Sequence, residues 1–324
     1  MRDYKRLIPI ISLTAILLTT SVAKESCSFV NRYNVESFDT STDLFTDCHV
    51  SDEYESNIGA FLKNSYFVPQ GLALDKDHTF ISFYDYFSDD KSIIKVFSNE
   101  GRLINTFSLP NTAHVGGISL DKDNNLLWVC STFGHVDAYR LDDVIYRNNA
   151  NPCYQNMNVG KNLPNYSNPF VNVASYMTVY DNNLYVGCFT INNPGKIKKY
   201  SISFDDDNAV HLNLADTIVV PSKIQGLTFY EKNGNTYLLL SRSFGCGRSS
   251  ALQIFKYQDD IKDYNDPELK SVTYEFPAMM EQISTLNDKL FSLYEYEAKV
   301  YGGENENELV LRITDMDQLF KRSS

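Results

Sequence analysis

The sequence feature that most constrains the fold is a run of short strands that recurs five times. Each unit has an apolar strand, a turn that contains Asp, Asn or Gly, a second apolar strand and a third strand, as residues 68–98 show. The residues that precede each first strand lie at intervals of 46, 59, 50 and 56 residues and are Gln70, Gly116, Ser175, Gln225 and Glu281. Repeats of this length with several strands per unit are typical of β-propellers. We therefore predict an all-β chain that forms a single β-propeller with five blades.

The two ends of the repeat suggest how the ring closes. The fifth unit stops after its third strand, and residues 24–66 are polar and lack sustained periodicity. We expect residues 24–66 to form an N-terminal extension that supplies a strand to the last blade, because closure removes exposed strand edges. Residues 67–324 would then form the propeller. Six blades is the alternative, if residues 30–66 contain a degenerate unit.

The opening of the first unit carries a family resemblance. Residues Gly71 to Phe83 read as a Gly followed by an apolar strand, an Asp, a turn and a second strand. Over about residues 68–320 the chain resembles secreted NHL-type and strictosidine-synthase-like propellers. The resemblance implies the fold and not an activity, because propellers include enzymes, receptors and scaffolds. Hydrolytic members often hold a metal ion in the channel, but their Asn and Asp ligands do not map onto these blades.

The first 23 residues have the composition of a secretory signal peptide. A cationic start, MRDYKR, precedes an apolar run, and Ser21, Val22 and Ala23 form a small-x-small cleavage pattern. We predict cleavage after Ala23 and a secreted protein, extracellular or, in a Gram-negative host, periplasmic. An uncleaved membrane anchor is the alternative, although the apolar run is short for a span. No later segment has the length and apolarity to cross a bilayer.

Charge and cysteine content narrow the partners and the compartment. The chain has a net charge of −12, and loss of residues 1–23 would make it −14. Nucleic acid is not expected as a partner, because its phosphates need Lys and Arg. The six cysteines make disulfides plausible in an exported chain, and Cys27 with Cys48 is the favoured pair. Alternatively, Cys130 and Cys188 lie in apolar strands and would be buried free thiols.

Propeller geometry places a candidate site at one end of the central channel. The segments that enter each first strand and leave each second strand meet on the same face, where ring-shaped repeat proteins often bind ligands. Polar and aromatic residues recur at these positions. The candidate ligand-binding residues are Gln70, Tyr84, Asp85, His114, Gln225, Arg242, Glu281 and Glu295.

These residues leave several functions open. The first is binding of a small polar or glycan-like ligand, or of an extracellular partner protein. The second is a hydrolase or lyase in which His114 acts as a base, Glu281 or Glu295 as an acid, and Arg242 holds an anionic group. Alternatively, the same residues form a polar plug that fixes the register of the blades.

A metal ion is a further possibility at the same face. No cofactor is assigned, but Asp85, Glu281 and Glu295 are residue types that calcium prefers. Zinc is not indicated, because the Cys and His residues lack the spacing of zinc ligands.

Overall fold

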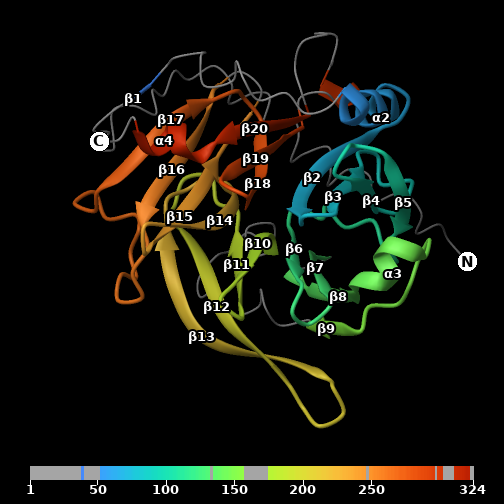
Figure 1. Ribbon diagram of the computed structural model, residues 1–324, viewed down its shortest axis with the longest axis horizontal. Coiled ribbons are helices and arrows are strands. Elements are labelled where there is room, and N and C mark those ends of the chain that lie inside the picture. The colour runs from blue at the N-terminus through green and yellow to red at the C-terminus, as the bar shows by residue number, and fades with distance from the viewer. Residues whose placement is uncertain are drawn as a thin grey trace, which may run out of the picture.

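Five antiparallel sheets surround a common centre in the computed structural model (Figure 1). The structure describes residues 38–39, 52–131, 134–156, 174–245, 248–295, 298–301 and 310–321. Each sheet contains one blade, and apart from a short N-terminal strand at the edge of blade four its strands follow one another in chain order from the centre outward. The prediction of an all-β propeller with five blades is therefore confirmed.

Blades one and two follow the predicted pattern most simply. Blade one contains β2 (Phe67–Leu74), β3 (His78–Asp85), β4 (Ile93–Ser98) and β5 (Leu103–Ser108). Blade two contains β6 (Ile118–Asp121), β7 (Leu126–Cys130), β8 (Val136–Arg140) and β9 (Tyr154–Asn156). The short helix α3 (Leu141–Tyr146) lies between β8 and β9. The fourth strand of blade two could not be recognised in the Asn- and Pro-rich sequence, because it is only three residues long.

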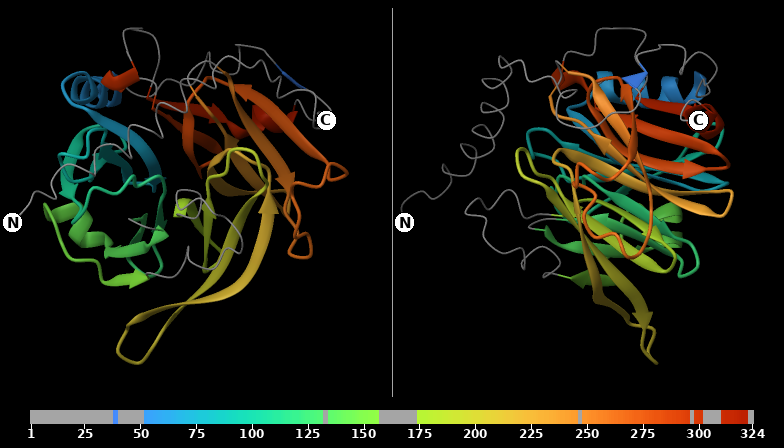
Figure 2. Two further views of the ribbon diagram at one scale, coloured as in Figure 1. Left: turned by 180° about the vertical axis from the view of Figure 1, so that it is seen from behind. Right: turned by 90° about the vertical axis from the view of Figure 1, so that its left-hand side faces the viewer.

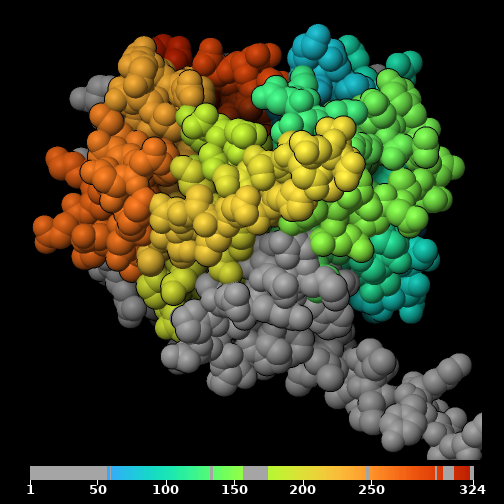
Figure 3. Space-filling model, turned by 90° about the horizontal axis from the view of Figure 1, so that it is seen from below, coloured from blue at the N-terminus to red at the C-terminus, as the bar shows by residue number. Residues whose placement is uncertain are grey.

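Blades three to five differ in their outer strands. Blade three contains β10 (Ala174–Tyr180), β11 (Asn183–Cys188), β12 (Gly195–Phe204) and β13 (Val210–Val220). The hairpin of β12 and β13 projects from the body (Figure 2) and faces the viewer in Figure 3. Blade four contains β14 (Ile224–Lys232), β15 (Asn235–Arg242), β16 (Ser250–Lys256) and β17 (Ser271–Phe276). Blade five contains β18 (Met280–Leu286), β19 (Lys289–Tyr294) and β20 (Leu311–Asp315), followed by α4 (Met316–Lys321).

The hydrophobic core is divided among the seams between neighbouring blades. Between blades one and two, Phe80 and Phe107 pack with Leu127 and Tyr139. Four further clusters occupy the other seams in the same way. Because burial of one large apolar side chain contributes roughly 1.5–3 kcal/mol, these seams hold the ring together.

A helix closes the ring at the seam between blades five and one. In α2 (Asp52–Lys63), Ile58 and Leu62 lie one turn apart and are buried against Leu72 of blade one and Leu311 of blade five. The N-terminal strand β1 (Phe38–Asp39) also joins the propeller, but it pairs in parallel with β17 at the outer edge of blade four. Within the described residues, blade five receives no N-terminal strand. The amphipathic face of α2 covers the blade that lacks a fourth strand.

Several sequence-based expectations concern parts of the chain outside the described residues. Residues 1–23, Cys27 and Cys48 lie there, so the signal peptide and the favoured disulfide stay predictions. Within the described residues, Cys130, Cys153 and Cys188 are free thiols, and Cys130 and Cys188 are buried. No described helix has the length and apolarity needed to cross a membrane.

Candidate functional site

The first strands of the five blades line the central channel. β2 packs beside β6 and β18, β10 packs beside β6 and β14, and β14 packs beside β18. Near the start of four of these strands the register to the second strand shifts by an irregularity, for example between Pro69 and Leu72 in β2. Such bulges turn side chains out of the regular alternation. Here they coincide with Gln70, Ser175, Gln225 and Glu281.

Glycine lets the innermost strands approach one another closely at the next position. A Cβ atom at Gly117 would lie 2.7 Å from Cα of Tyr176. One at Gly226 would lie 2.7 Å from Cα of Gln282. Both distances are shorter than any normal contact, so the backbones could not come this close with a larger residue. The narrow centre of the ring therefore depends on these glycines.

The side chain of Gln282 in β18 occupies this narrow centre. Its Oε1 accepts hydrogen bonds from the backbone N–H of Leu72 (3.0 Å) and of Ile118 (2.9 Å). Its Nε2 donates to the backbone O of Ile118 (2.7 Å) and of Met177 (3.0 Å). One amide thus joins blade five to blades one, two and three and uses its full hydrogen-bonding capacity. Gln282 divides the channel into two ends.

Two glutamates meet at the end of the channel where the first strands begin. Glu281 lies in β18, directly before Gln282, and Glu295 follows β19 in the same blade. Gln70 Nε2 donates to Glu295 Oε2 at 3.0 Å, and Gln225 Nε2 donates to Glu281 Oε1 at 3.2 Å. These bonds cross the seams from blade one and from blade four. We call Gln70, Tyr84, His114, Gln225, Glu281, Glu295 and Tyr301 the mouth cluster.

Burial and mutual repulsion change the acidity of the two glutamates. Glu281 is 3% exposed, and desolvation followed by the charge of Glu295 raises its pKa well above the ordinary value. Desolvation also raises the pKa of Glu295 to about 7, although hydrogen bonds from Gln70 and Tyr301 oppose the rise. Neither carboxylate forms an ion pair with a described basic residue. Near neutral pH the pair therefore retains at least one proton.

Aromatic residues form one wall of the mouth cluster. The hydroxyls of Tyr84 and Tyr301 lie close to one another and to Glu295, so that each group influences the pKa of its neighbour. Tyr301 belongs to the 3-10 helix η4 (Lys299–Tyr301). The ring of His114 packs against Tyr84 in a tilted arrangement, with centroids 4.1 Å apart and an interplanar angle of 36°. From Tyr301 the rings continue through Tyr86 and Phe87 to Tyr66.

His114 is neutral at pH 7. Its side chain is exposed to solvent, and the partial desolvation that the surrounding protein imposes lowers its pKa to about 4. Among the described residues it makes no hydrogen bond to Glu281 or Glu295. The role of His114 as a base in the hydrolase hypothesis therefore stays a prediction.

Two of the predicted site residues have other tasks. Oδ2 of Asp85 accepts the backbone N–H of Asp89 (2.8 Å) and of Asp90 (3.2 Å), which fixes the loop after β3. Nε of Arg242 donates to the backbone O of Ser222 at 3.0 Å, before β14. The structure thus brings together six of the eight predicted residues and places Asp85 and Arg242 in loop contacts. Nowhere in the described ranges do three or more His, Cys, Asp or Glu side chains gather to hold a metal ion.

Sequence reasoning missed Gln282 and Tyr301. Gln282 is equivalent to Gly71, Gly117, Tyr176 and Gly226, so a long polar side chain at a position where three blades have glycine was the available signal. Tyr301 follows an irregular segment after β19 and has no equivalent in the repeat. No sequence signal places it beside Glu295.

Comparisons with known proteins add little beyond the fold. No family model and no curated protein matches the sequence. A solved chain from a nidogen–laminin complex is 13% identical over 71% of this chain and 73% of that chain, with a TM-score of 0.40. A mutant β-fructofuranosidase of glycoside hydrolase family 32 from Bombyx mori, solved with sucrose, is 12% identical over 81% of this chain and 65% of the enzyme, with a TM-score of 0.42. Likenesses this weak carry no argument about function, and the resemblance to NHL-type and strictosidine-synthase-like propellers stays a prediction.

Proposed function

We propose that the mouth cluster binds a small polar, glycan-like ligand that donates several hydrogen bonds. The observation that carries the proposal is the pair of carboxylates, Glu281 and Glu295, each held by a glutamine and without a described basic partner. Carboxylate oxygens only accept hydrogen bonds when ionised, so a ligand with hydroxyl groups satisfies them. A hydroxyl-rich ligand also supplies an acceptor for the second N–H of the Gln225 amide, whereas both N–H groups of Gln70 already donate to Pro69 O and Glu295.

The aromatic wall supports a ring-shaped ligand. Tyr84 and His114 provide packed rings beside the carboxylates, and Phe87 and Tyr66 extend this wall to the surface, where they are 58% and 44% exposed. Small-molecule sites commonly combine aromatic surfaces with a few polar groups that fix orientation. A sugar ring has one apolar face and a rim of hydroxyls, which matches this combination.

Binding of a panel of neutral mono- and oligosaccharides to the full chain tests the proposal. Isothermal titration calorimetry should show binding that strengthens as the pH rises through about 7, because a donor-rich ligand prefers the ionised carboxylates. Glu295→Gln should weaken binding at pH 8 by about tenfold, since each lost charge-assisted hydrogen bond contributes roughly 1.5–3 kcal/mol. The control Glu268→Gln changes an exposed carboxylate in the loop between β16 and β17. Equal affinity of wild type and Glu295→Gln for every sugar tested at pH 8, or binding of none of them, would refute the proposal.

Hydrolysis at the same place is the second candidate, and one observation favours it. Glu295, with a pKa raised to about 7, could donate a proton to a leaving group near neutral pH. This version relies on the glutamate pair rather than on His114. The test is release of nitrophenol from nitrophenyl glycosides. Release by the wild type that is abolished in Glu295→Gln would establish hydrolytic activity at this site. Binding without turnover would leave the recognition role alone.

Export and a protein partner belong to the same proposal. The composition of residues 1–23 supports secretion, and amino-terminal sequencing of the exported protein should begin at Lys24. An extracellular protein that presents a donor-rich group to the mouth cluster is an alternative ligand. It would compete with the sugar in the calorimetric assay.

A further inference from the structure

We propose that the channel has a second binding site, at the end opposite the mouth cluster, for a small uncharged molecule with several hydroxyl groups. This site is chemically distinct from the mouth cluster, and the inference does not depend on the proposed function. It rests on a cavity, on the residues that line it, and on the way Gln282 closes it.

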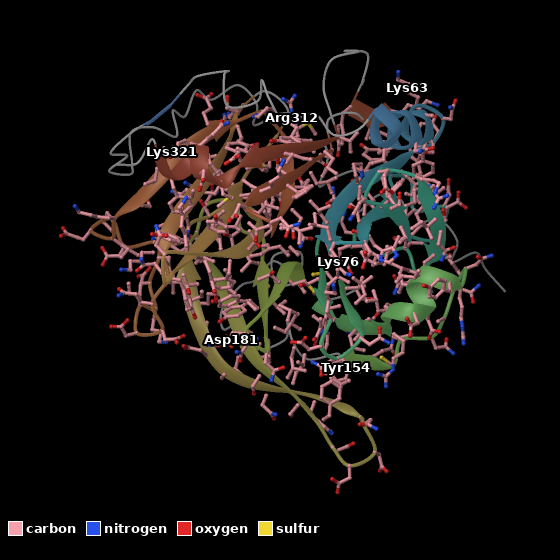
Figure 4. The ribbon with its side chains drawn as sticks, viewed as in Figure 1. Lys63, Lys76, Tyr154, Asp181, Arg312 and Lys321 are labelled. Carbon is pink, nitrogen blue, oxygen red and sulfur yellow. The ribbon has the colours of Figure 1, made fainter. Side chains whose placement is uncertain are left out.

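The cavity has a volume of about 170 Å³ and is lined by all five first strands. Each first strand runs from the mouth cluster to a hairpin turn, so the cavity lies at the hairpin end of the channel. Lys76 and Asp181, labelled in Figure 4, belong to two of these turns. Gln282 forms part of the lining and separates the cavity from the mouth cluster.

Hydroxyl side chains recur at equivalent positions of the lining. The repeat was aligned on Gln70, Gly116, Ser175, Gln225 and Glu281. Three residues after these positions the five blades carry Ala73, Ser119, Thr178, Thr228 and Ser284. All five residues line the cavity. Four of the five therefore present a hydroxyl at the same level of the ring.

The hydrogen bonds of these hydroxyls show which can bind a ligand. Thr285 Oγ1 donates to the backbone O of Phe229, so Thr228 donates to Thr285 and its proton is used. Oγ of Ser119 accepts the backbone N–H of Val179 at 2.7 Å and keeps its own proton for a further bond. The half-buried Thr178 and Ser284 make no side-chain hydrogen bond to other described residues. Ser119, Thr178 and Ser284 thus offer donors and acceptors to a ligand.

The lining also limits the charge and size of the ligand. None of the residues that line the cavity is Asp, Glu, Lys, Arg or His. A charged ligand would lose hydration there without gaining a counter-charge, whereas hydroxyl groups can be paired one by one. Pockets for drug-sized ligands are about 300–1,000 Å³, so this cavity suits a molecule of about monosaccharide size or less.

Gln282 makes the two sites independent. All four of its hydrogen-bonding positions are engaged by the backbone, so it has none left for a ligand on either side. Binding in the cavity should therefore rely on the hydroxyl ring. It should also be insensitive to the protonation of Glu281 and Glu295.

The experiment is an NMR titration of the full-length exported protein, with amide signals of both channel ends followed separately. The probes are glucose, xylitol and glycerol, and the charged analogues glucosamine and glucuronate. At least one neutral probe should shift the amides of Thr178 and Ser284, with the same affinity at pH 5 and pH 8, and the charged analogues of glucose should bind more weakly there. Thr178→Val and Ser284→Ala should each weaken that binding about fivefold, since each removes one hydrogen bond.

Ser203→Ala is the matched control, because it removes an exposed hydroxyl from β12, away from the channel. It should leave the affinity unchanged. The inference fails if no neutral probe shifts the cavity amides, which would mean that the cavity holds water only. It also fails if Thr178→Val and Ser284→Ala bind as the wild type does, or if the charged analogues bind equally well. The amide signals of the cavity report each of these results, so they can be distinguished from the presence or absence of binding at the mouth cluster.

Discussion

The two ends of the channel are built from the same five strands, yet they differ in chemistry. At one end, Glu281 and Glu295 share a buried, aromatic-walled space. At the other, the lining contains hydroxyls and no charged residue. Between them one side chain, Gln282, occupies the position at which three other blades have glycine. A repeated backbone can therefore present two different surfaces. Close packing is needed only at the centre of the ring, so the strand positions on either side of it can carry different side chains.

The largest effect is expected from removing the side chain that separates the two ends. Gln282→Ala leaves two buried N–H groups and two carbonyls without their partner, and it should lower the free energy of unfolding by about 3 kcal/mol or more. Urea denaturation measures this loss. Gln225→Ala, which removes one half-buried hydrogen bond, should cost about 1 kcal/mol or less. Similar losses in both variants would contradict a special role for Gln282.

A smaller effect is expected in the pH dependence of the unfolding free energy, to which the acidic end contributes and the neutral end does not. A carboxyl whose pKa is higher in the folded than in the unfolded state binds its proton more tightly when folded, so stability is lost as the pH rises between the two values. For Glu295 this window runs from 4.5 to about 7. Glu295→Gln should abolish on the order of 2 kcal/mol of that loss.

Thr178→Val serves as the control at the neutral end, where the lining contains no Asp, Glu, Lys, Arg or His. Its unfolding free energy should fall between pH 5 and pH 8 as steeply as that of the wild type. Urea denaturation at several pH values makes the comparison. An unchanged pH dependence in Glu295→Gln would mean that the carboxyl pair is not buried as described.

The sequence repeat predicted the architecture and part of the mouth cluster. Aligning Gln70, Gln225 and Glu281 was enough to bring these residues to one end of the ring, because equivalent positions of a closed repeat must meet there. The same reasoning could not separate Asp85 from Tyr84. Adjacent strand residues point to opposite faces, and Asp85 instead accepts backbone N–H groups of its own loop.

Closure and the aromatic wall were harder to predict. The stretch that forms α2 is mostly polar, and its apolar face is limited to Ile58, Phe61 and Leu62, a pattern too short to stand out in a segment expected to supply a strand. Tyr301 reaches Glu295 through a one-turn helix outside the repeat. Contacts made outside the repeat depend on tertiary packing and have no periodic signal in the sequence.

The most direct test of the difference between the two ends is the titration of Glu295 itself. Carboxyl carbon NMR of glutamate-labelled protein, assigned with Glu281→Gln and Glu295→Gln, follows each group through its pKa. The expected result is a midpoint near 7 for Glu295 that stays in place in Thr178→Val, and a higher midpoint for Glu281 that falls when Glu295 is replaced. An ordinary midpoint near 4.3 for Glu295, or a Glu281 midpoint unaffected by Glu295→Gln, would contradict the buried carboxyl pair on which the mouth cluster rests.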